Sequence, residues 1–289
     1  MATGLSDATR FQDLLDRPDT DGPYDFPTIF PAKGWGDRRR SKKKFKLLKR
    51  IDPEVREMLE EGERVQHVTW GTAVSFLEAY FFGWVIYYLN QRALVVTDRR
   101  VLMIQIDTRR RPGVLRDQLR YAAIERIKGT LLGNTQIRMR DGKTRLFSHV
   151  PRKDRAVLQQ VLRDLRGKVG PDRAVQDIEH LCPRCYQIVR DFPATCPSCG
   201  TKLKSPRKAV LLSLAFPGLG VFYLGYRKLG AFKVVVAALV WLSYLMPDPQ
   251  YPMTLPGILI GAVFLLVFMH GGLALATRYL ARRGVYPAR

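Results

Sequence analysis

The chain has 289 residues and carries 48 Lys and Arg against 26 Asp and Glu, a net charge of +22 with a sequence pI of about 10.2. This length allows two or three small domains, and the charge predicts an anionic partner: nucleic acid, phosphate or a lipid surface. Apolar residues concentrate in residues 72–90 and 209–280. The second block argues against a soluble nucleic-acid-binding protein, which has no use for it.

Residues 1–36 are rich in Pro, Asp and Gly and lack the apolar core of a signal peptide, so we expect a mobile cytoplasmic tail. The basic segment 37–59 follows, and its RRRSKKKFKLLKR stretch has nine cations in thirteen residues. Such a run suits a solvated helix, a nucleic-acid arm or an anionic-lipid contact, and the nearby apolar segments favour lipid. The candidate lipid contacts here are Arg38, Arg39, Arg40, Lys42, Lys43 and Lys44.

Residues 60–168 show a strand-rich pattern that ends in a helix. Alternating residues predict strands over 64–70 and 92–107, and the Asp141-Gly142 pair predicts a hairpin turn within 135–147. Pro151 and Gly167 bound the predicted helix, because proline suits a helix start and glycine a helix end. Its apolar face consists of Val157, Leu158, Val161, Leu162 and Leu165.

The stretches EGERV, LVVTDRRVLMI, IERI and MRDGKTRLF, together with the final helix, resemble the bacterial pleckstrin-homology (PH) domain. The resemblance implies a bent sheet that the helix plugs at one end. It suggests phospholipid binding by analogy alone, since a fold does not fix a function. The candidate phosphate contacts are Arg99, Arg100, Arg109, Arg110 and Arg111, and a solvated strand face and loop are the alternative.

An apolar insertion, residues 72–90, interrupts this domain and carries Glu78 as its single charge. Nineteen such residues are long enough to span a bilayer. A span would place strands of one small domain on opposite sides of the membrane, so the favoured interpretation is a lobe that rests on or dips into the bilayer. A buried core segment is the second interpretation and a true span the third.

After a linker over 169–179, all four cysteines lie in two CPxC pairs within residues 180–204: Cys182 with Cys185 and Cys196 with Cys199. The segment resembles a zinc ribbon, in which four thiolates supply a tetrahedral Zn²⁺ site. A complete Cys₄ set leaves no open position for catalysis, so the expected role of Zn²⁺ is structural. A redox dithiol and a rubredoxin-like iron site are the alternatives. The absence of scattered cysteines agrees with a reducing compartment.

Residues 207–284 form the predicted transmembrane region, whose first apolar segment is interrupted by proline and glycines. Its PGLGVFYLG stretch resembles the PGxGxFYxG motif of a family of small two-helix transmembrane domains. We expect the motif to pack helices, because glycine lets backbones approach closely in lipid. The predicted packing residues are Pro217, Gly218, Gly220, Phe222, Tyr223 and Gly225.

Residues 231–246 and 255–277 are predicted to form an antiparallel transmembrane hairpin, whose first helix must start near Lys228 to reach spanning length. Cations flank the hairpin but not its connection, which predicts cytoplasmic N- and C-termini at the inner membrane. Residues 209–226 are expected to be re-entrant or interfacial. His270 lies within the second predicted helix, and an ionisable residue inside a membrane is a candidate functional residue. The favoured interpretation is a neutral ring that is hydrogen-bonded to a backbone carbonyl.

The predicted fold class is therefore an α+β multidomain membrane protein. Common nucleotide-binding, metalloprotease and serine hydrolase motifs are absent from the sequence, so we expect no enzyme. The expected function is a membrane-anchored adaptor, or an accessory subunit of a larger complex such as a transporter, contacting anionic lipid and partner subunits. A membrane-tethered nucleic-acid-binding protein is the main alternative, weakened by aromatic residues that lie away from the ribbon. A small oligomeric channel or carrier is the third.

Overall fold

The structure is a computed structural model that describes residues 22–30, 35–73, 85–130, 134–170, 177–246 and 254–288. Contacts divide the chain into two compact units, Met1–Leu181 and Cys182–Arg289, here called the sheet unit and the helical unit. The helices of the sheet unit are α2 (Phe26–Ile29), α3 (Trp35–Met58), α5 (Val85–Leu89), the 3₁₀ turn η1 (Tyr121–Ala123) and α6 (Arg152–Gly167). Its strands are β1 (Val65–Ala73), β2 (Gln91–Thr97), β3 (Arg100–Ile106), β4 (Pro112–Arg120), β5 (Ile124–Gly129), β6 (Thr135–Met139), β7 (Thr144–Ser148) and β8 (Glu179–Leu181).

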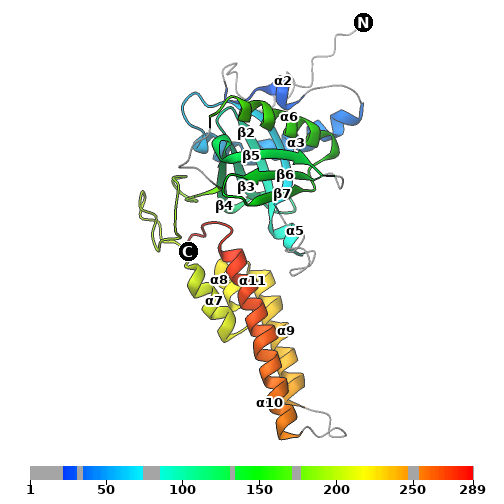
Figure 1. The fold of residues 1–289 in the computed structure, drawn as a ribbon, viewed down its shortest axis with the longest axis vertical. Coiled ribbons are helices and arrows are strands. Elements are labelled where there is room, and N and C mark those ends of the chain that lie inside the picture. Colours follow the sequence, from blue (N-terminus) through cyan, green and yellow to red (C-terminus); the bar gives the residue numbers. More distant parts are fainter. Residues whose placement is uncertain are drawn as a thin grey trace. The chain divides into compact units, whose positions relative to one another are not determined.

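One antiparallel sheet organises the sheet unit, with strand order β5-β6-β7-β1-β2-β3-β4-β8. β1 joins the two halves: it pairs with β2 over most of its length but with β7 only at Thr72 and Ala73. This brief pairing lets β5, β6 and β7 run across β2 (Figure 1). Side chains from both halves then enclose one core, which includes Leu94, Met103 and Phe147.

The helix predicted from residue 151 is α6, and it closes this core. Leu158, Leu162 and Leu165 of its apolar face are buried in the same cluster as the strand residues. The predicted hairpin is confirmed as β6 and β7, with Gly142 at φ 83° in the turn. Glycine reaches this left-handed conformation without the penalty that a Cβ atom brings.

The sheet unit includes residues on both sides of the predicted β domain. Residues 179–181, expected to end the linker and open the ribbon, form the edge strand β8 on β4. The basic segment lies within the unit as α3, whose Leu47, Leu48 and Ile51 are fully buried. Polar contacts bind α3 to the sheet, because Glu54 pairs with Arg116 of β4. Most of the apolar insertion lies outside the described residues, and only its last part is described, as α5.

The helical unit begins with the cysteine-rich segment and continues into helices. These are α7 (Pro206–Ala215), α8 (Leu219–Leu224), α9 (Arg227–Leu245), α10 (Leu255–Phe264), the π-helical η2 (Leu265–Gly271) and α11 (Gly272–Ala281). α10, η2 and α11 form one continuous helix beside α9, and α7 and α8 pack near one end of the pair (Figure 1). The helices Arg227–Leu245 and Leu255–Ala281 are long and apolar enough to cross a membrane. The first begins where the sequence predicted, next to Lys228.

His67 on β1 is 1% exposed, and neither ring nitrogen has a hydrogen-bond partner among the described residues. Burial, and then the charges of Lys44 and Arg40, hold the pKa of His67 well below the usual 6.5. As pH falls below about 6.5, the unfolded chain therefore takes up a proton at His67 that the folded chain does not. We expect folding stability to fall between pH 7 and pH 5.

Urea unfolding of the full-length protein in detergent at several pH values measures this loss. Carboxylates also contribute at acid pH, so the informative quantity is the difference between the wild type and His67→Phe, which lacks the titrating ring. The wild type should lose more stability over this interval than the variant. Parallel pH profiles would show that His67 does not carry the effect.

Candidate functional site

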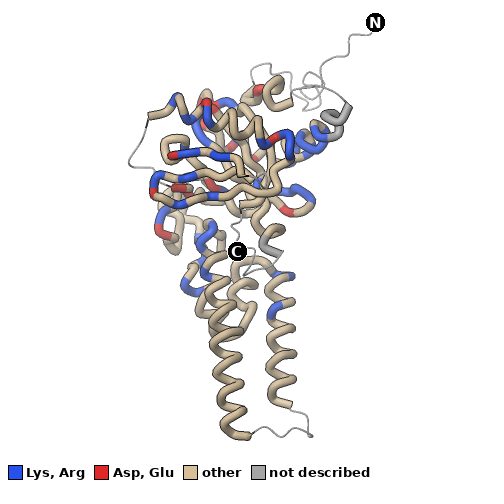
Figure 2. Tube along the Cα trace, turned by 45° about the vertical axis from the view of Figure 1, so that its right-hand side comes forward, with Lys and Arg blue, Asp and Glu red and all other residues tan. Residues whose placement is uncertain are grey.

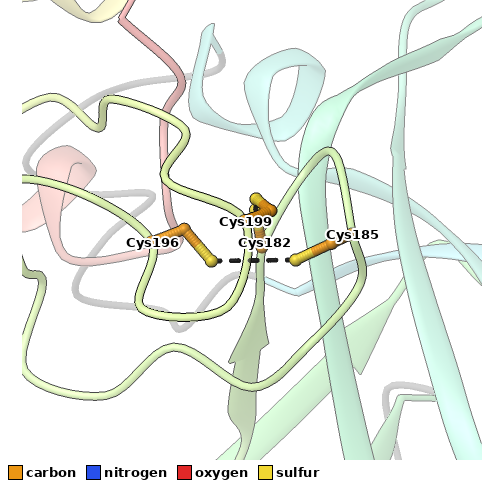
Figure 3. A group of neighbouring side chains, drawn as sticks. All are labelled: Cys182, Cys185, Cys196 and Cys199. Carbon is orange, nitrogen blue, oxygen red and sulfur yellow. Dashed lines mark hydrogen bonds between the residues drawn. The ribbon is translucent and has the colours of Figure 1, made fainter.

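The four cysteines come together in the helical unit (Figure 3). Their Sγ atoms all lie within 4.8 Å of one another, and the Cys182–Cys199 and Cys185–Cys196 pairs are both 3.7 Å apart. A tetrahedral site with metal–sulfur bonds of about 2.3 Å has edges of about 3.8 Å, whereas a disulfide needs about 2.05 Å. The spacing therefore fits four ligands around one metal ion, and no disulfide links these cysteines.

Each CPxC pair forms the same backbone turn. The Cys182 N–H donates to the Gln187 carbonyl at 2.9 Å, and the Cys196 N–H donates to the Thr201 carbonyl at 2.8 Å. The residue after the second cysteine closes each turn in a left-handed conformation, Tyr186 with φ 56° and Gly200 with φ 70°. Cys185 of the first turn and Cys196 of the second point toward each other (Figure 3). Two such turns can supply the four thiols of a tetrahedral site.

Local contacts shift the pKa values of these thiols in opposite directions. Cys182 and Cys196 are buried, and burial raises the pKa of the Cys182 thiol. Hydrogen bonds from Thr201 lower the pKa of Cys199, whose Sγ lies 3.1 Å from the Thr201 hydroxyl. Because the thiolate is the form that binds a metal, Thr201 favours the ligand form of Cys199. The spacing of the CPxC pairs did not predict this role of Thr201.

The end of the chain completes the small core around the cysteines. Val285 is buried in one cluster with Cys182, Val189, Cys196 and Leu203. Residues 285–288, here called the C-terminal segment, pair with residues 202–204 like a short strand. The Lys204 N–H donates to the Tyr286 carbonyl and the Ala288 N–H to the Lys202 carbonyl, both at 2.8 Å. The cysteine cluster and the segment that follows α11 therefore share one core.

In the sheet unit, two predicted cation groups lie together although about 60 residues separate them in sequence. Arg110 Nη1 donates to the Lys43 carbonyl at 3.0 Å, and Arg50 Nη1 donates to the Arg109 carbonyl. The β3–β4 loop is thus bound to the middle of α3. Figure 2 shows Lys and Arg gathered along α3. The exposed cations of this basic surface are Lys42, Lys43, Lys46, Lys49, Arg109 and Arg111.

Arg110 sits where the basic surface meets a group of aromatic residues. Its guanidinium lies 3.8 Å from the centroid of the Trp70 ring, with the backbone at φ 60°. The two residues border a hollow of about 380 Å³ that Tyr87, Tyr88 and His149 also line. Cation–π stacking fixes the guanidinium beside this hollow. Trp70 is the last residue of a predicted strand. The alternating pattern of that strand did not indicate that Trp70 stacks on Arg110.

Two predicted phosphate-contacting cations are instead buried in ion pairs, and this part of the prediction is wrong. Lys44 is 3% exposed and lies 3.1 Å from Asp154 of α6. Arg100 is 8% exposed and pairs with Glu63 at 2.8 Å.

The remaining predicted cations differ in their surroundings. Arg99 is half-exposed and pairs with Glu60 at 3.2 Å, whereas Arg40 lies 3.8 Å from Asp154. The side chains of Arg38 and Arg39 fall outside the described part of the chain.

The glycine motif forms the junction between α7, α8 and α9. Gly218 caps α8 at φ 98°, and a Cβ atom at Gly220 would clash with the Ala209 carbonyl and the Ser213 hydroxyl. Pro217 is buried, so Pro217, Gly218 and Gly220 lie at close contacts, whereas Gly225 is exposed and ends α8 at φ 108°.

The two aromatic residues of the motif differ in their contacts. The Tyr223 hydroxyl accepts from the Ser205 N–H, and Lys204 and Lys208 flank the ring. Phe222 is 47% exposed, and its backbone and Cβ lie against Gly230 of α9.

His270 connects three helical segments. Its Nδ1 lies 2.8 Å from the Leu214 carbonyl, and its Nε2 accepts from Trp241 Nε1 at 3.0 Å. A ring with a proton on Nδ1 alone satisfies both contacts, so the geometry matches the neutral histidine expected from the sequence. This contact fixes the C-terminal end of α7 against η2.

No protein-family model matches this chain, and no curated protein is similar to it.

Proposed function

We propose that this protein is a non-catalytic adaptor or accessory subunit of a larger membrane complex. In this proposal α9 and the continuous helix α10–α11 form a transmembrane hairpin in the inner membrane, with both termini cytoplasmic. The sheet unit is a PH-like domain, and the cysteine cluster is a zinc ribbon that holds Zn²⁺ structurally. The cation distribution supports the orientation, because Arg227 and Lys228 begin α9 and Arg278 lies in the last turn of α11. In an antiparallel hairpin these two ends lie on the same side.

One observation carries the lipid-binding part of the proposal: α3 and the β3–β4 loop, remote in sequence, join into one basic surface beside Trp70. Clustered cations attract an anionic membrane by about 1 kcal/mol each near the surface. Tryptophan suits the interface between water and lipid. A hairpin anchor alone would keep the protein in the membrane, so the basic surface serves lipid choice or orientation.

Hydrogen exchange of the full-length protein in nanodiscs tests this surface. Amides of residues 107–111 should be protected several-fold more in discs with anionic phospholipid than in neutral discs. The triple variant Lys42→Gln, Lys43→Gln, Arg111→Gln should lose this difference. The control Arg126→Gln, Lys128→Gln, Arg163→Gln removes the same charge from exposed positions elsewhere and should keep it. Equal protection in both disc types would contradict the proposal.

Affinity purification from detergent-solubilised membranes tests the adaptor role. A stoichiometric membrane protein such as a permease or an ATPase should co-purify with the wild-type chain. Recovery of nucleic acid alone, lost steeply as salt rises, would instead support the nucleic-acid-binding alternative.

A further inference from the structure

A groove of about 470 Å³ runs between α7 and the η2–α11 part of the long helix. Val210 and Leu214 of α7 form one wall, and Val267 and Leu275 form the other. Among the described residues that line the groove, Arg278 alone is charged, and it lies at the end toward the C-terminus of α11. The groove is therefore apolar along its length with a cation at one end.

Polar contacts hold the two walls in place. The hydroxyls of Ser213 and Thr277 are fully buried and lie 2.7 Å apart, joining α7 to α11. The His270 contact with the Leu214 carbonyl joins the other end of α7 to η2. A Cβ atom at Gly272 would meet nothing within 4 Å, so there is open space beside this residue. The groove is a formed feature of the unit, and a preformed site binds at lower entropic cost.

The dimensions of the groove suit a lipid tail. Val267 and Arg278 are separated by about 16 Å along the helix at 1.5 Å per residue. One leaflet contributes about half of the 30 Å hydrocarbon thickness of a bilayer, a comparable depth. An acyl chain that lies along Val267–Leu275 would thus place its headgroup near Arg278.

The helical unit has a large excess of positive charge, which favours binding of an anion from outside the unit. Residues 182–289 contain thirteen Lys and Arg but only two Asp and no Glu. Among the described residues of this unit, no carboxylate pairs with Arg278. Arg207 is exposed on α7, three residues before Val210, and therefore lies one helical turn along the same side. Two arginines near the end of an apolar groove complement a phosphate.

We propose that this groove binds one anionic phospholipid, with an acyl chain between α7 and α11 and the phosphate at Arg278. The site lies in the helical unit and is separate from the basic surface of the sheet unit. It rests on the proposed function only in requiring that the hairpin lie in a membrane.

Native mass spectrometry of the full-length protein, extracted from membranes in mild detergent, counts the phospholipid that each variant retains. The wild type should keep anionic phospholipid through detergent exchange. Gly272→Leu fills the groove where the structure leaves room and should reduce retention at least ten-fold. Arg278→Gln should reduce retention of anionic lipid about five-fold. Arg227→Gln, which removes an exposed cation outside the groove, should retain as much as the wild type.

Two results would overturn the inference while leaving the membrane anchor intact. One is a wild-type chain that is recovered from membranes but loses all phospholipid in detergent. The other is retention that Gly272→Leu leaves unchanged, which would mean that the lipid is adventitious. A wild-type chain that stays in the supernatant without detergent would instead reject the anchoring part of the proposed function, and the lipid site with it.

Discussion

Replacing Cys196 with serine should abolish metal binding and release the C-terminal segment from the ribbon. Cys196 is 2% exposed, and its Sγ lies 3.7 Å from that of Cys185. Metal binding contributes on the order of 10–16 kcal/mol to the folding of small Cys-rich modules, which have little other core. Val285 packs on the cysteines themselves. Without the ion, we expect this core to loosen and residues 285–288 to lose their pairing.

Elemental analysis of the purified protein should find about one zinc ion per wild-type chain and none in Cys196→Ser. Carboxypeptidase should remove the last residues of the variant many times faster than those of the wild type. Ser198→Ala is the matched control, since this exposed serine lies in the same CPxC turn. A variant that keeps its metal and its protected end would refute the prediction. A metal-free wild type with an oxidisable thiol pair would support the redox alternative.

Several features of the fold and the metal site could be predicted because their determinants are local in sequence. The CPxC turn brings two thiols together within four residues, so the spacing alone indicated the four-cysteine cluster. The Asp141-Gly142 turn and the apolar face of α6 are equally local signals. The breaks at Gly218 and Gly225 followed from the conformations that only glycine adopts easily.

The errors arose where a charged residue finds its partner far along the chain. Lys44 and Arg100 belong to basic runs, which are typical of solvated surfaces. The partner of Lys44 is Asp154, which lies 110 residues away in the sequence. The buried face of α3 was also not predicted. Its apolar residues Leu47, Leu48 and Ile51 are surrounded in the sequence by lysines and arginines, which are typical of an exposed helix. The pairing of the C-terminal segment with residues 202–204 spans about 80 residues. No local pattern specifies such contacts.

The same geometry makes Asp154 a critical residue of the sheet unit, and Asp154→Asn should destabilise it by about 3–5 kcal/mol. Asp154 is 2% exposed; it binds Lys44 at 3.1 Å and accepts from the Thr69 hydroxyl at 3.2 Å. Burial already lowers the pKa of Lys44, and the Asp154 carboxylate opposes this effect. Without the carboxylate, an ammonium group would remain buried with only the Ile29 carbonyl as its partner among these contacts. The charge must then be exposed or neutralised, and both cost stability.

Pulse proteolysis of the full-length protein in detergent, across a urea series, measures this loss as a lower midpoint for the sheet unit. Asp164→Asn is the matched control, because Asp164 is exposed on the same helix, and its midpoint should match the wild type. The double variant Lys44→Met, Asp154→Asn removes both charges and should recover most of the stability, since a buried pair replaced by neutral groups is often close to neutral overall. If the single and double variants were equally unstable, the loss would come from packing around Asp154 rather than from the unpaired charge of Lys44.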